Sequence, residues 1–476
     1  MRSVLRLFGV ASVLALVVSC GSGDGEENSG DAIIGTDVTM ADQHEADNWF
    51  PEMDLILPDG NVAPEGPGNQ EFAINTTLFE DQMNPAVAAL SDDGFVVLWQ
   101  SGRAPITQAP QDGSGWGVFG RRFLPNAAPE SEEFNVNSSI ADDQQRPDVS
   151  AFADGSFLAV WESSNQDGSL KGVYLQRFAN NGTRQGSETI VNTTTNGSQS
   201  LPRVDSRNSG DFMVVWQTTG GLDGDAEAVF GQSYATGAVR RGPEFQANTY
   251  FEDGQTEPSV AALGDSGNYV IVWGSMGQDN GIGYGVYGQI VDQQGAAVGE
   301  EFIVNTEISG QQQNPDVAAL PDGGFVVVWQ SFPGQDGDGA GVFGQAYTSS
   351  GTRSGLEFQV NTFAPGHQTL PRIASFDDGT FLVVWQSCPS GDSASGGDGD
   401  GCGIYGQKFD APAMPSGGIF QANQYNTGNQ ERPDLATFSN KAFVIVWNSQ
   451  HEDDPDDLED YGVRGRYFPP GYTPGQ

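Results

Sequence analysis

The sequence predicts an all-β protein whose main domain, over residues 67–476, is a seven-bladed β-propeller. Three observations lead to this fold class. Four short segments recur in the same order in seven repeats. The segments are rich in valine, phenylalanine and tyrosine and are bounded by glycine, aspartate, asparagine or proline, as β-strands are. The fourth segment also occurs once before the first complete repeat and is missing from the last one.

The first two segments of each repeat predict a hairpin. The first has the form PAVAAL, the second has the form FVVLW, and turns such as DDG or DGG join them. The second segment ends at Trp99, Trp161, Trp216, Trp273, Trp329, Trp385 and Trp447. Runs such as FVVVW are apolar at every position, which suits a strand that is buried on both faces by stacked blades. We expect the tryptophans to pack between blades; a sugar-binding ring is the alternative.

The last two segments predict how the ring closes. The third has the form GVFG, and the fourth has the form EFAIN and ends at an asparagine. The fourth segment first occurs at 71–75, whereas the last repeat stops after its third segment at 462–468. We expect these two stretches to pair, because strand exchange completes the last blade and removes an exposed edge. This arrangement resembles that of known seven-bladed propellers over about 400 residues.

The N-terminal segment has the features of an export signal. Arg2 and Arg6 accompany an apolar run that is too short to span a bilayer. The motif LVVSC ends at Cys20 and resembles the lipobox of bacterial lipoproteins, which implies a signal peptide over 1–19 and lipidation of Cys20. The resemblance implies an outer-membrane location that faces the periplasm or the cell surface. Residues 20–66 are acidic and lack apolar periodicity, and they predict a disordered, flexible linker.

Cys388 and Cys402, the two remaining cysteines, flank one acidic loop. In an exported protein this placement predicts a disulfide. A two-cysteine metal site is the alternative, but no histidine lies near the pair in the sequence.

The charge balance excludes several classes of partner. The chain has 20 basic and 63 acidic residues and a formal net charge of −43, which repels nucleic acid and anionic lipid headgroups. The expected partner is a protein or a glycan at the cell envelope. Membrane contact is expected only through the lipid anchor, and the chain is expected to be a monomer.

The acidic loops between the second and third segments are candidate calcium sites, because closely spaced carboxylates supply oxygen ligands. The best pairs are Asp223 with Asp225, Asp336 with Asp338, and Asp398 with Asp400. The D-x-D-x-D-G pattern is incomplete, however, since Ala340 and Cys402 offer no side-chain oxygen. A solvated Asp-Gly turn is the competing interpretation. Calcium is the one cofactor that the sequence suggests.

A glutamine stands three residues before the proline of each first segment. These residues are Gln82, Gln144, Gln199, Gln255, Gln312, Gln368 and Gln430. They would lie near the propeller axis, on the face that the acidic loops share. One interpretation makes them a polar ligand face; the other makes them caps for backbone groups where blades join.

The function predicted from these features is a lipid-anchored binding, adhesion or scaffold module without enzymatic activity. The three histidines lie far apart, and neither a nucleophile elbow nor a phosphate-binding loop occurs. The repeats are similar to those of adhesin-like and haemolysin-type bacterial surface proteins, which implies a surface location. The alternative is a secreted propeller hydrolase that acts on glycans, which a deep axial pocket with two carboxylates about 5–10 Å apart and a nearby arginine would favour.

Overall fold

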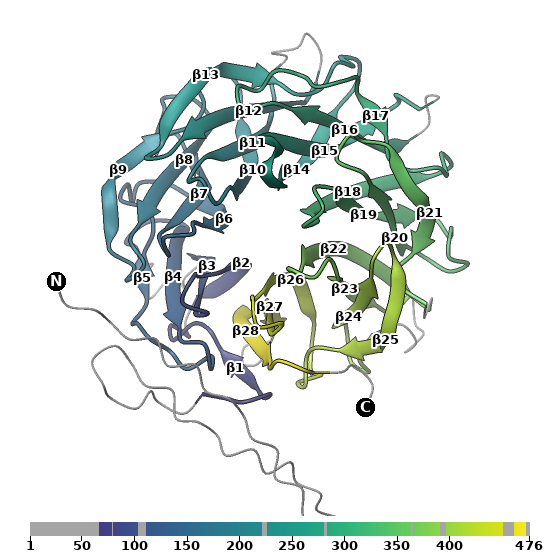
Figure 1. Ribbon diagram of the computed structural model, residues 1–476. Helices are drawn as coiled ribbons and strands as arrows, with labels where there is room; N and C mark the ends of the chain where they lie inside the picture. The colour runs from purple at the N-terminus through teal and green to yellow at the C-terminus, as the bar shows by residue number, and fades with distance from the viewer. Residues whose placement is uncertain are drawn as a thin grey trace, which may run out of the picture. The chain divides into compact units, whose positions relative to one another are not determined.

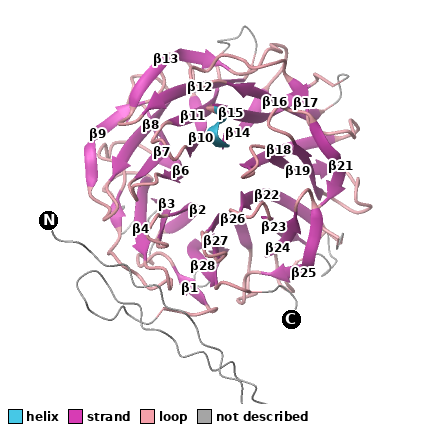
Figure 2. Ribbon diagram, in the orientation of Figure 1, coloured by secondary structure: helices cyan, strands magenta, loops and turns pink. Residues whose placement is uncertain are grey.

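The computed structural model describes residues 66–78, 80–102, 111–220, 226–279, 283–362, 365–390, 397–450 and 461–472. These residues form seven four-stranded antiparallel sheets, arranged as blades around an axis (Figure 1). The predicted seven-bladed β-propeller is therefore confirmed. Among the residues just given, Figure 2 shows one short helical segment, the 3-10 helix η1 (Gly264–Ser266). No helix within the described ranges has the length and apolar character that crossing a membrane requires.

The strands follow one another from the axis to the rim in each blade. Blade 1 contains β2 (Asp81–Ala89), β3 (Phe95–Gly102), β4 (Gly117–Phe123) and β5 (Phe134–Asn135). Blade 2 contains β6 (Gln144–Ala151), β7 (Phe157–Ser164), β8 (Lys171–Phe178) and β9 (Arg184–Ile190). Blade 3 contains β10 (Gln199–Ser206), β11 (Phe212–Thr218), β12 (Ala228–Ala235) and β13 (Val239–Gln246). Blade 4 contains β14 (Gln255–Leu263), β15 (Asn268–Met276), β16 (Tyr284–Val291) and β17 (Phe302–Ile303).

The remaining blades repeat this order. Blade 5 contains β18 (Gln311–Ala319), β19 (Phe325–Phe332), β20 (Gly341–Tyr347) and β21 (Arg353–Gln359). Blade 6 contains β22 (His367–Ser375), β23 (Phe381–Cys388), β24 (Gly403–Asp410) and β25 (Met414–Gln421). Blade 7 contains β26 (Gln430–Thr437), β27 (Phe443–Gln450) and β28 (Tyr461–Phe468), and its outer strand is β1 (Glu71–Ala73).

Each second strand contributes to two hydrophobic cores, one on either side of its blade. In β3, Val97 and Trp99 pack against Val444 of blade 7, whereas Leu98 packs toward Trp161 of blade 2. All seven repeat tryptophans are at most 2% exposed, and each belongs to a core shared with the preceding blade. The prediction that they pack between blades is confirmed.

The N-terminal strand closes the ring as predicted. β1 pairs with β28 in antiparallel register, with Phe72 opposite Gly465. Just beyond the strand, Ile74 is 0% exposed in the core between blades 7 and 1. The Ile74 N–H donates to the carbonyl of Val463 (3.0 Å), and the Asn75 side-chain carbonyl accepts from the N–H of Val463 (2.7 Å).

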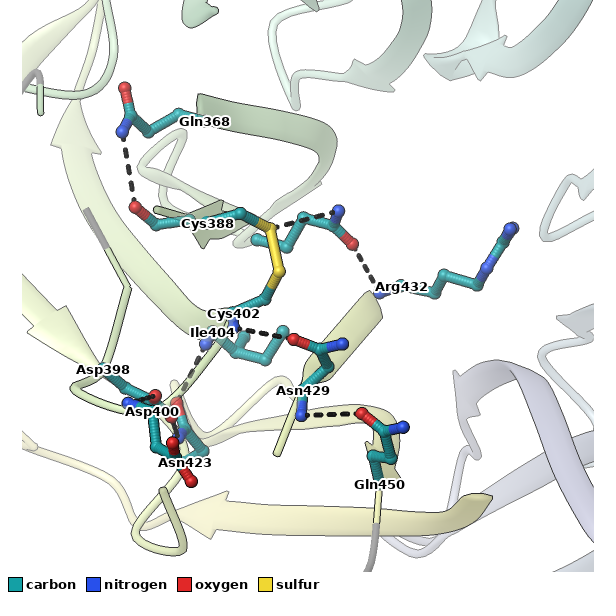
Figure 3. The surroundings of a disulfide bond; sticks show 12 residues. Gln368, Cys388, Asp398, Asp400, Cys402, Ile404, Asn423, Asn429, Arg432 and Gln450 are labelled. Atoms are coloured by element: carbon teal, nitrogen blue, oxygen red, sulfur yellow. Dashed lines mark hydrogen bonds between the residues drawn. A yellow bond between two sulfur atoms is a disulfide. The ribbon is translucent and has the colours of Figure 1, made fainter. Parts of the chain in front are cut away.

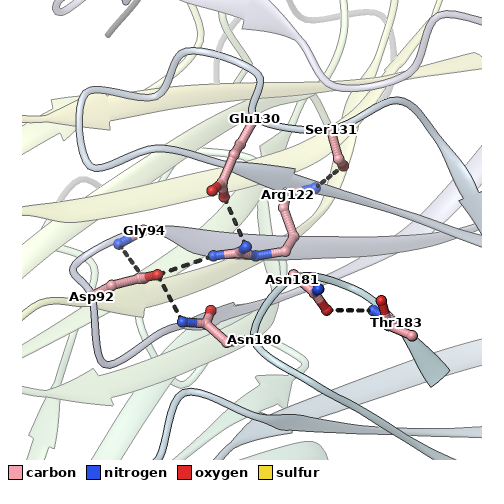
Figure 4. Close-up of polar contacts among 8 residues, drawn as sticks. All are labelled: Asp92, Gly94, Arg122, Glu130, Ser131, Asn180, Asn181 and Thr183. Carbon is pink, nitrogen blue, oxygen red and sulfur yellow. Dashed lines mark hydrogen bonds and ion pairs between the residues drawn. The ribbon is translucent and has the colours of Figure 1, made fainter. Parts of the chain in front are cut away.

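A buried arginine joins blades 1 and 2 far from the site described below. Arg122 is 4% exposed, and its guanidinium pairs with Asp92 (3.1 Å) and Glu130 (2.9 Å) (Figure 4). The Asp92 carboxylate also accepts a hydrogen bond from Asn180, which follows β8. Two carboxylates thus compensate one buried guanidinium, as burial of a charge requires.

Candidate functional site

The inner strands of the seven blades begin around a cavity on the propeller axis. The cavity has a volume of about 440 Å³, and a second cavity of about 340 Å³ lies farther along the inner strands. Arg203, Arg372 and Asp434 line both. The loops between second and third strands lie at the same end of the sheets as the first cavity, because Gln311 at the start of β18 pairs with Phe332 at the end of β19. The axial cavity therefore opens on the face expected to bind a ligand.

A ring of seven residues lines the first cavity, one from each blade, each directly before the proline of its inner strand. We call them the mouth ring: Asn84, Arg146, Leu201, Glu257, Asn314, Leu370 and Arg432. All have positive φ values between 50° and 57°. The register of each inner strand shifts at this point, which is the mark of a β-bulge. Left-handed backbone is unfavourable for arginine, leucine and glutamate, and such strained residues cluster at functional sites.

Contacts between blades hold the mouth ring in place. In six blades, the mouth-ring N–H donates to the side-chain oxygen of the residue that follows the tryptophan of the preceding blade. In blade 4 the residue after the tryptophan is Gly274, which has no side chain and offers no oxygen to Asn314, the mouth-ring residue of blade 5. The Glu257 carboxylate replaces the missing oxygen and accepts from the N–H of Asn314 (2.8 Å). Its second oxygen, Oε1, accepts no hydrogen bond from the described residues, so Glu257 is oriented and still has an available oxygen.

A second ring lies one step deeper, directly after the same prolines. We call it the charged ring: Ala86, Asp148, Arg203, Ser259, Asp316, Arg372 and Asp434. Its aspartates accept hydrogen bonds from the inner strand of the next blade; Asp434, for example, accepts from the N–H of Val87 (2.8 Å). The ring thus has a structural role and also places carboxyls and guanidiniums together at the axis.

Burial raises the pKa of several carboxyl groups around the axis. Burial raises the pKa of Asp434 to about 7 and the pKa of Asp205, on the same strand as Arg203, to about 6. Burial also raises the pKa of Glu257. Arg203 and Arg372 partly oppose the pKa shifts of both Asp434 and Glu257, so the two carboxyls share the same guanidiniums. Carboxyls whose pKa lies near neutrality are suited to proton transfer.

The seven predicted glutamines do not form a ligand face, and this interpretation of them is corrected here. Their side chains are at most 1% exposed. Gln144 is representative: its amide nitrogen donates to the carbonyl of Ala141 (2.7 Å), and its amide oxygen accepts from Asn137 (3.0 Å). The same contact to the carbonyl three residues earlier recurs at Gln199, Gln255, Gln312, Gln368 and Gln430. Six of the seven glutamines thus cap the interblade loops, which is the other interpretation that the sequence allowed, and the amide nitrogen of Gln82 donates to the hydroxyl of Ser101.

The predicted disulfide between Cys388 and Cys402 is present, with the two sulfur atoms 2.07 Å apart (Figure 3). It joins the end of β23 to the start of β24 across the acidic loop of blade 6. In that loop, Asp398 accepts from the side chain of Asn423 (2.6 Å) and Asp400 accepts from the N–H of Gly428. These carboxylates therefore bind the neighbouring interblade loop.

The calcium prediction receives no test from the structure. Asp336 and Asp338 bond to Asn361 and Gly366, as their counterparts do in blade 6. Asp223 and Asp225 lie outside the described residues, as does Cys20. Within the described ranges, no three His, Cys, Asp or Glu side chains are grouped so that they could hold a metal ion.

The residues around the axial cavity were missed by the sequence analysis. A signal for them exists, because the residues on either side of the repeat proline differ from blade to blade in a frame that is otherwise regular. At the mouth ring alone they are Asn, Arg, Leu, Glu, Asn, Leu and Arg. Structural positions in a repeat favour one residue type, so this variation marks the positions that face the axis.

Comparisons with known proteins return distant structural likenesses only. No protein-family model and no curated protein matches the chain. A protein of unknown function from Dyadobacter fermentans is 10% identical and covers 85% of this chain and 99% of its own, with a TM-score of 0.47. An α-L-arabinanase of Penicillium chrysogenum in complex with arabinobiose is 12% identical, with coverages of 75% and 99% and a TM-score of 0.44. A GH93 α-L-arabinofuranosidase of Fusarium graminearum with arabinobiose is 12% identical, with coverages of 84% and 97% and a TM-score of 0.43.

The predicted binding, adhesion or scaffold module without enzymatic activity is corrected at this point. The solved structures above that have a stated activity are an arabinanase and an arabinofuranosidase, enzymes of the kind that the alternative prediction names and not of the kind that the main prediction names. Identities this low do not transfer an activity to this chain. The axial cavity itself is lined by two carboxyl groups, those of Glu257 and Asp434, and by four arginines. The main prediction relied on the absence of sequence motifs, and carboxyls that line one cavity from different blades leave no such motif.

Proposed function

We propose that the protein is a propeller hydrolase that cleaves glycosidic bonds in the axial cavity. The observation that carries the proposal is that Asp434 and Glu257 both line the axial cavity, where Arg203 and Arg372 act on the pKa of each. Most glycosidases use two carboxyl groups, one that donates a proton to the leaving oxygen and one that acts at the anomeric carbon directly or through water. These two residues come from blades 7 and 4 and reach the cavity from different sides of the ring.

Asp434 has the properties of the proton donor. With a pKa of about 7, it keeps its proton up to neutral pH without leaving the cavity wall. Glu257 is proposed as the second carboxyl, because Asn314 holds one of its oxygens and the other is available. In the proposed reaction the glycosidic C–O bond breaks and Asp434 protonates the departing oxygen, while water adds its hydroxyl to the anomeric carbon and gives its proton to Glu257.

Isosteric variants test these roles, since Asp434→Asn and Glu257→Gln each keep an oxygen for the backbone N–H that the native side chain binds. Each is expected to lower kcat by about 10²–10⁴-fold with little change in melting temperature. Reducing-sugar release from a panel of neutral and acidic glycans is the measurement. Asp292→Asn, in the turn after β16, is the matched control and should retain wild-type activity.

The pH dependence gives an independent readout. Wild-type kcat should fall as pH rises through about 7, because Asp434 then loses the proton that it must donate. The residual activity of Asp434→Asn should lack this alkaline decline. If no glycan in the panel is cleaved, or if both variants are as active as wild type, the hydrolase proposal is wrong.

We further propose that the enzyme is attached to the cell envelope through a lipid on Cys20, as the lipobox resemblance implies. Mass spectrometry of membrane-extracted protein should show an N-terminal fragment that begins at Cys20 and carries a diacyl or triacyl adduct. Cys20→Ala is expected to release the protein from membranes, whereas Cys388→Ala, with the thiol of Cys402 blocked, is the control and should not. Firm membrane association of Cys20→Ala would contradict the anchor.

A further inference from the structure

The positive charges of the mouth ring are concentrated on one side of the ring. Blades 7, 1 and 2 are consecutive around the closed ring, since β2 contacts both β26 and β6. Their mouth-ring residues are Arg432, Asn84 and Arg146. Glu257, the one carboxylate of the ring, stands in blade 4. One sector of the mouth thus presents two guanidiniums and an amide; Asp434 lies two residues after Arg432 in this sector, whereas Glu257 lies in blade 4.

These two exposed arginines have fewer carboxylate contacts than Arg122 has. Arg432 makes no side-chain hydrogen bond or ion pair within the described residues, and in Figure 3 its side chain extends away from the disulfide between Cys388 and Cys402. The guanidinium of Arg146 is 3.7 Å from Glu162, but its side chain is 45% exposed and Glu162 also binds Lys171. Arg122, by contrast, is enclosed by two carboxylates (Figure 4).

Arg146 and Arg432 also repel each other. Burial lowers the pKa of Arg432, and the positive charge of Arg146 lowers it further, although Glu431 acts in the opposite direction. The chain has only 20 basic residues against 63 acidic ones, yet four arginines line this cavity. Two like charges held at one rim, in a strongly acidic protein, form a site that an anion would complete.

We propose that Arg432, Asn84 and Arg146 bind an anionic group of the substrate, so that the protein acts on acidic glycans that carry carboxylate or sulfate groups. That the bound glycan is a substrate rests on the proposed hydrolase function. Binding of the glycan itself does not depend on catalysis. Guanidiniums bind such groups through paired, charge-assisted hydrogen bonds, and Asn84 can add a donor. The surrounding acidic loops would disfavour anions elsewhere on this face.

Isothermal titration calorimetry in a Glu257→Gln background, where turnover is prevented, tests the inference. The probes are a uronic-acid oligosaccharide, a sulfated oligosaccharide and a neutral arabino-oligosaccharide of equal length. Arg146→Met and Arg432→Met should each weaken binding of the preferred anionic probe about tenfold, and the double variant about a hundredfold. Binding of the neutral probe should not change. Arg207→Met, in the turn between β10 and β11 at the other end of the sheets, is the matched control.

Salt provides a second measurement that needs no variant. Affinity for an anionic probe should fall as ionic strength rises from 0.05 to about 0.5 M, because added salt screens the guanidinium–anion attraction. Preference between the uronic-acid and the sulfated probe identifies the group. Tightest binding of the neutral probe, or affinity for anions that is unchanged in the double variant, overturns the inference. Arginine-dependent binding of an anionic glycan that the wild type does not cleave supports the inference and overturns the hydrolase proposal.

Discussion

Deletion of residues 67–76 is expected to open the ring and to abolish the cooperative melting transition of the native propeller. The deletion removes β1 and leaves the edge of β28 unpaired, next to the disrupted core between blades 7 and 1. Ile74 is 0% exposed in that core, and truncation of such a side chain alone costs about 2–5 kcal/mol. Differential scanning calorimetry of the two chains, with size-exclusion chromatography to detect association through the new edge, measures the effect.

Two further variants separate strand exchange from a general effect of shortening the chain. Deletion of residues 21–60, outside the described residues, should leave the melting temperature unchanged. Ile74→Ala should lower it by an intermediate amount, because the backbone pairing of β1 with β28 persists. Equal melting temperatures for the two deletions would show that the ring does not depend on β1 for closure.

Trp329→Ala is expected to destabilise the propeller by about 3–5 kcal/mol. The side chain is 0% exposed and packs between blades 4 and 5, against Val272, Val286 and Phe343. The indole N–H has no hydrogen-bond partner within the described part of the chain, so truncation removes packing rather than a polar contact. Urea denaturation followed by circular dichroism measures the change in the free energy of unfolding.

Trp116→Ala is the matched control for this prediction. Trp116 directly precedes β4 and belongs to none of the seven interblade cores, so its truncation should cost clearly less. Trp329→Phe should recover part of the loss, since a smaller aromatic ring fills part of the space. Equal costs for Trp116→Ala and Trp329→Ala would show that the tryptophans do not hold the blades together.

The blade architecture was predictable because each blade is a local structure. A run such as FVVVW in β19 has no polar position, so it must be buried on both sides, and this requirement follows from the residues alone. The displaced fourth segment, now β1, predicted closure because the last repeat has three strands and the segment supplies the fourth strand that each other blade has. The cysteine pair was predictable for a similar reason, since both residues flank one loop.

The role of the seven glutamines could not be predicted from the sequence. Their regular position before each repeat proline indicated importance, but the sequence could not distinguish a ligand face from a cap. The structure places Gln144 against Asn137 and the carbonyl of Ala141, so regularity at this position reflects a hydrogen bond that every blade needs. The neighbouring positions that vary, from Arg146 to Glu257 and Arg432, are the ones that face the cavity.

The sequence by itself determined the number of blades, their strand order, the strand that closes the ring and the disulfide, because each depends on short patterns that repeat or lie close together. Only the tertiary structure decided the candidate site. Closure of the ring places Arg432 of the last blade near Arg146 of the second blade. It also buries Asp434, and this burial raises the pKa of Asp434 to about 7. The pKa of a carboxyl depends on its loss of hydration and on charges from other blades, and neither can be predicted from the residues next to it in the sequence.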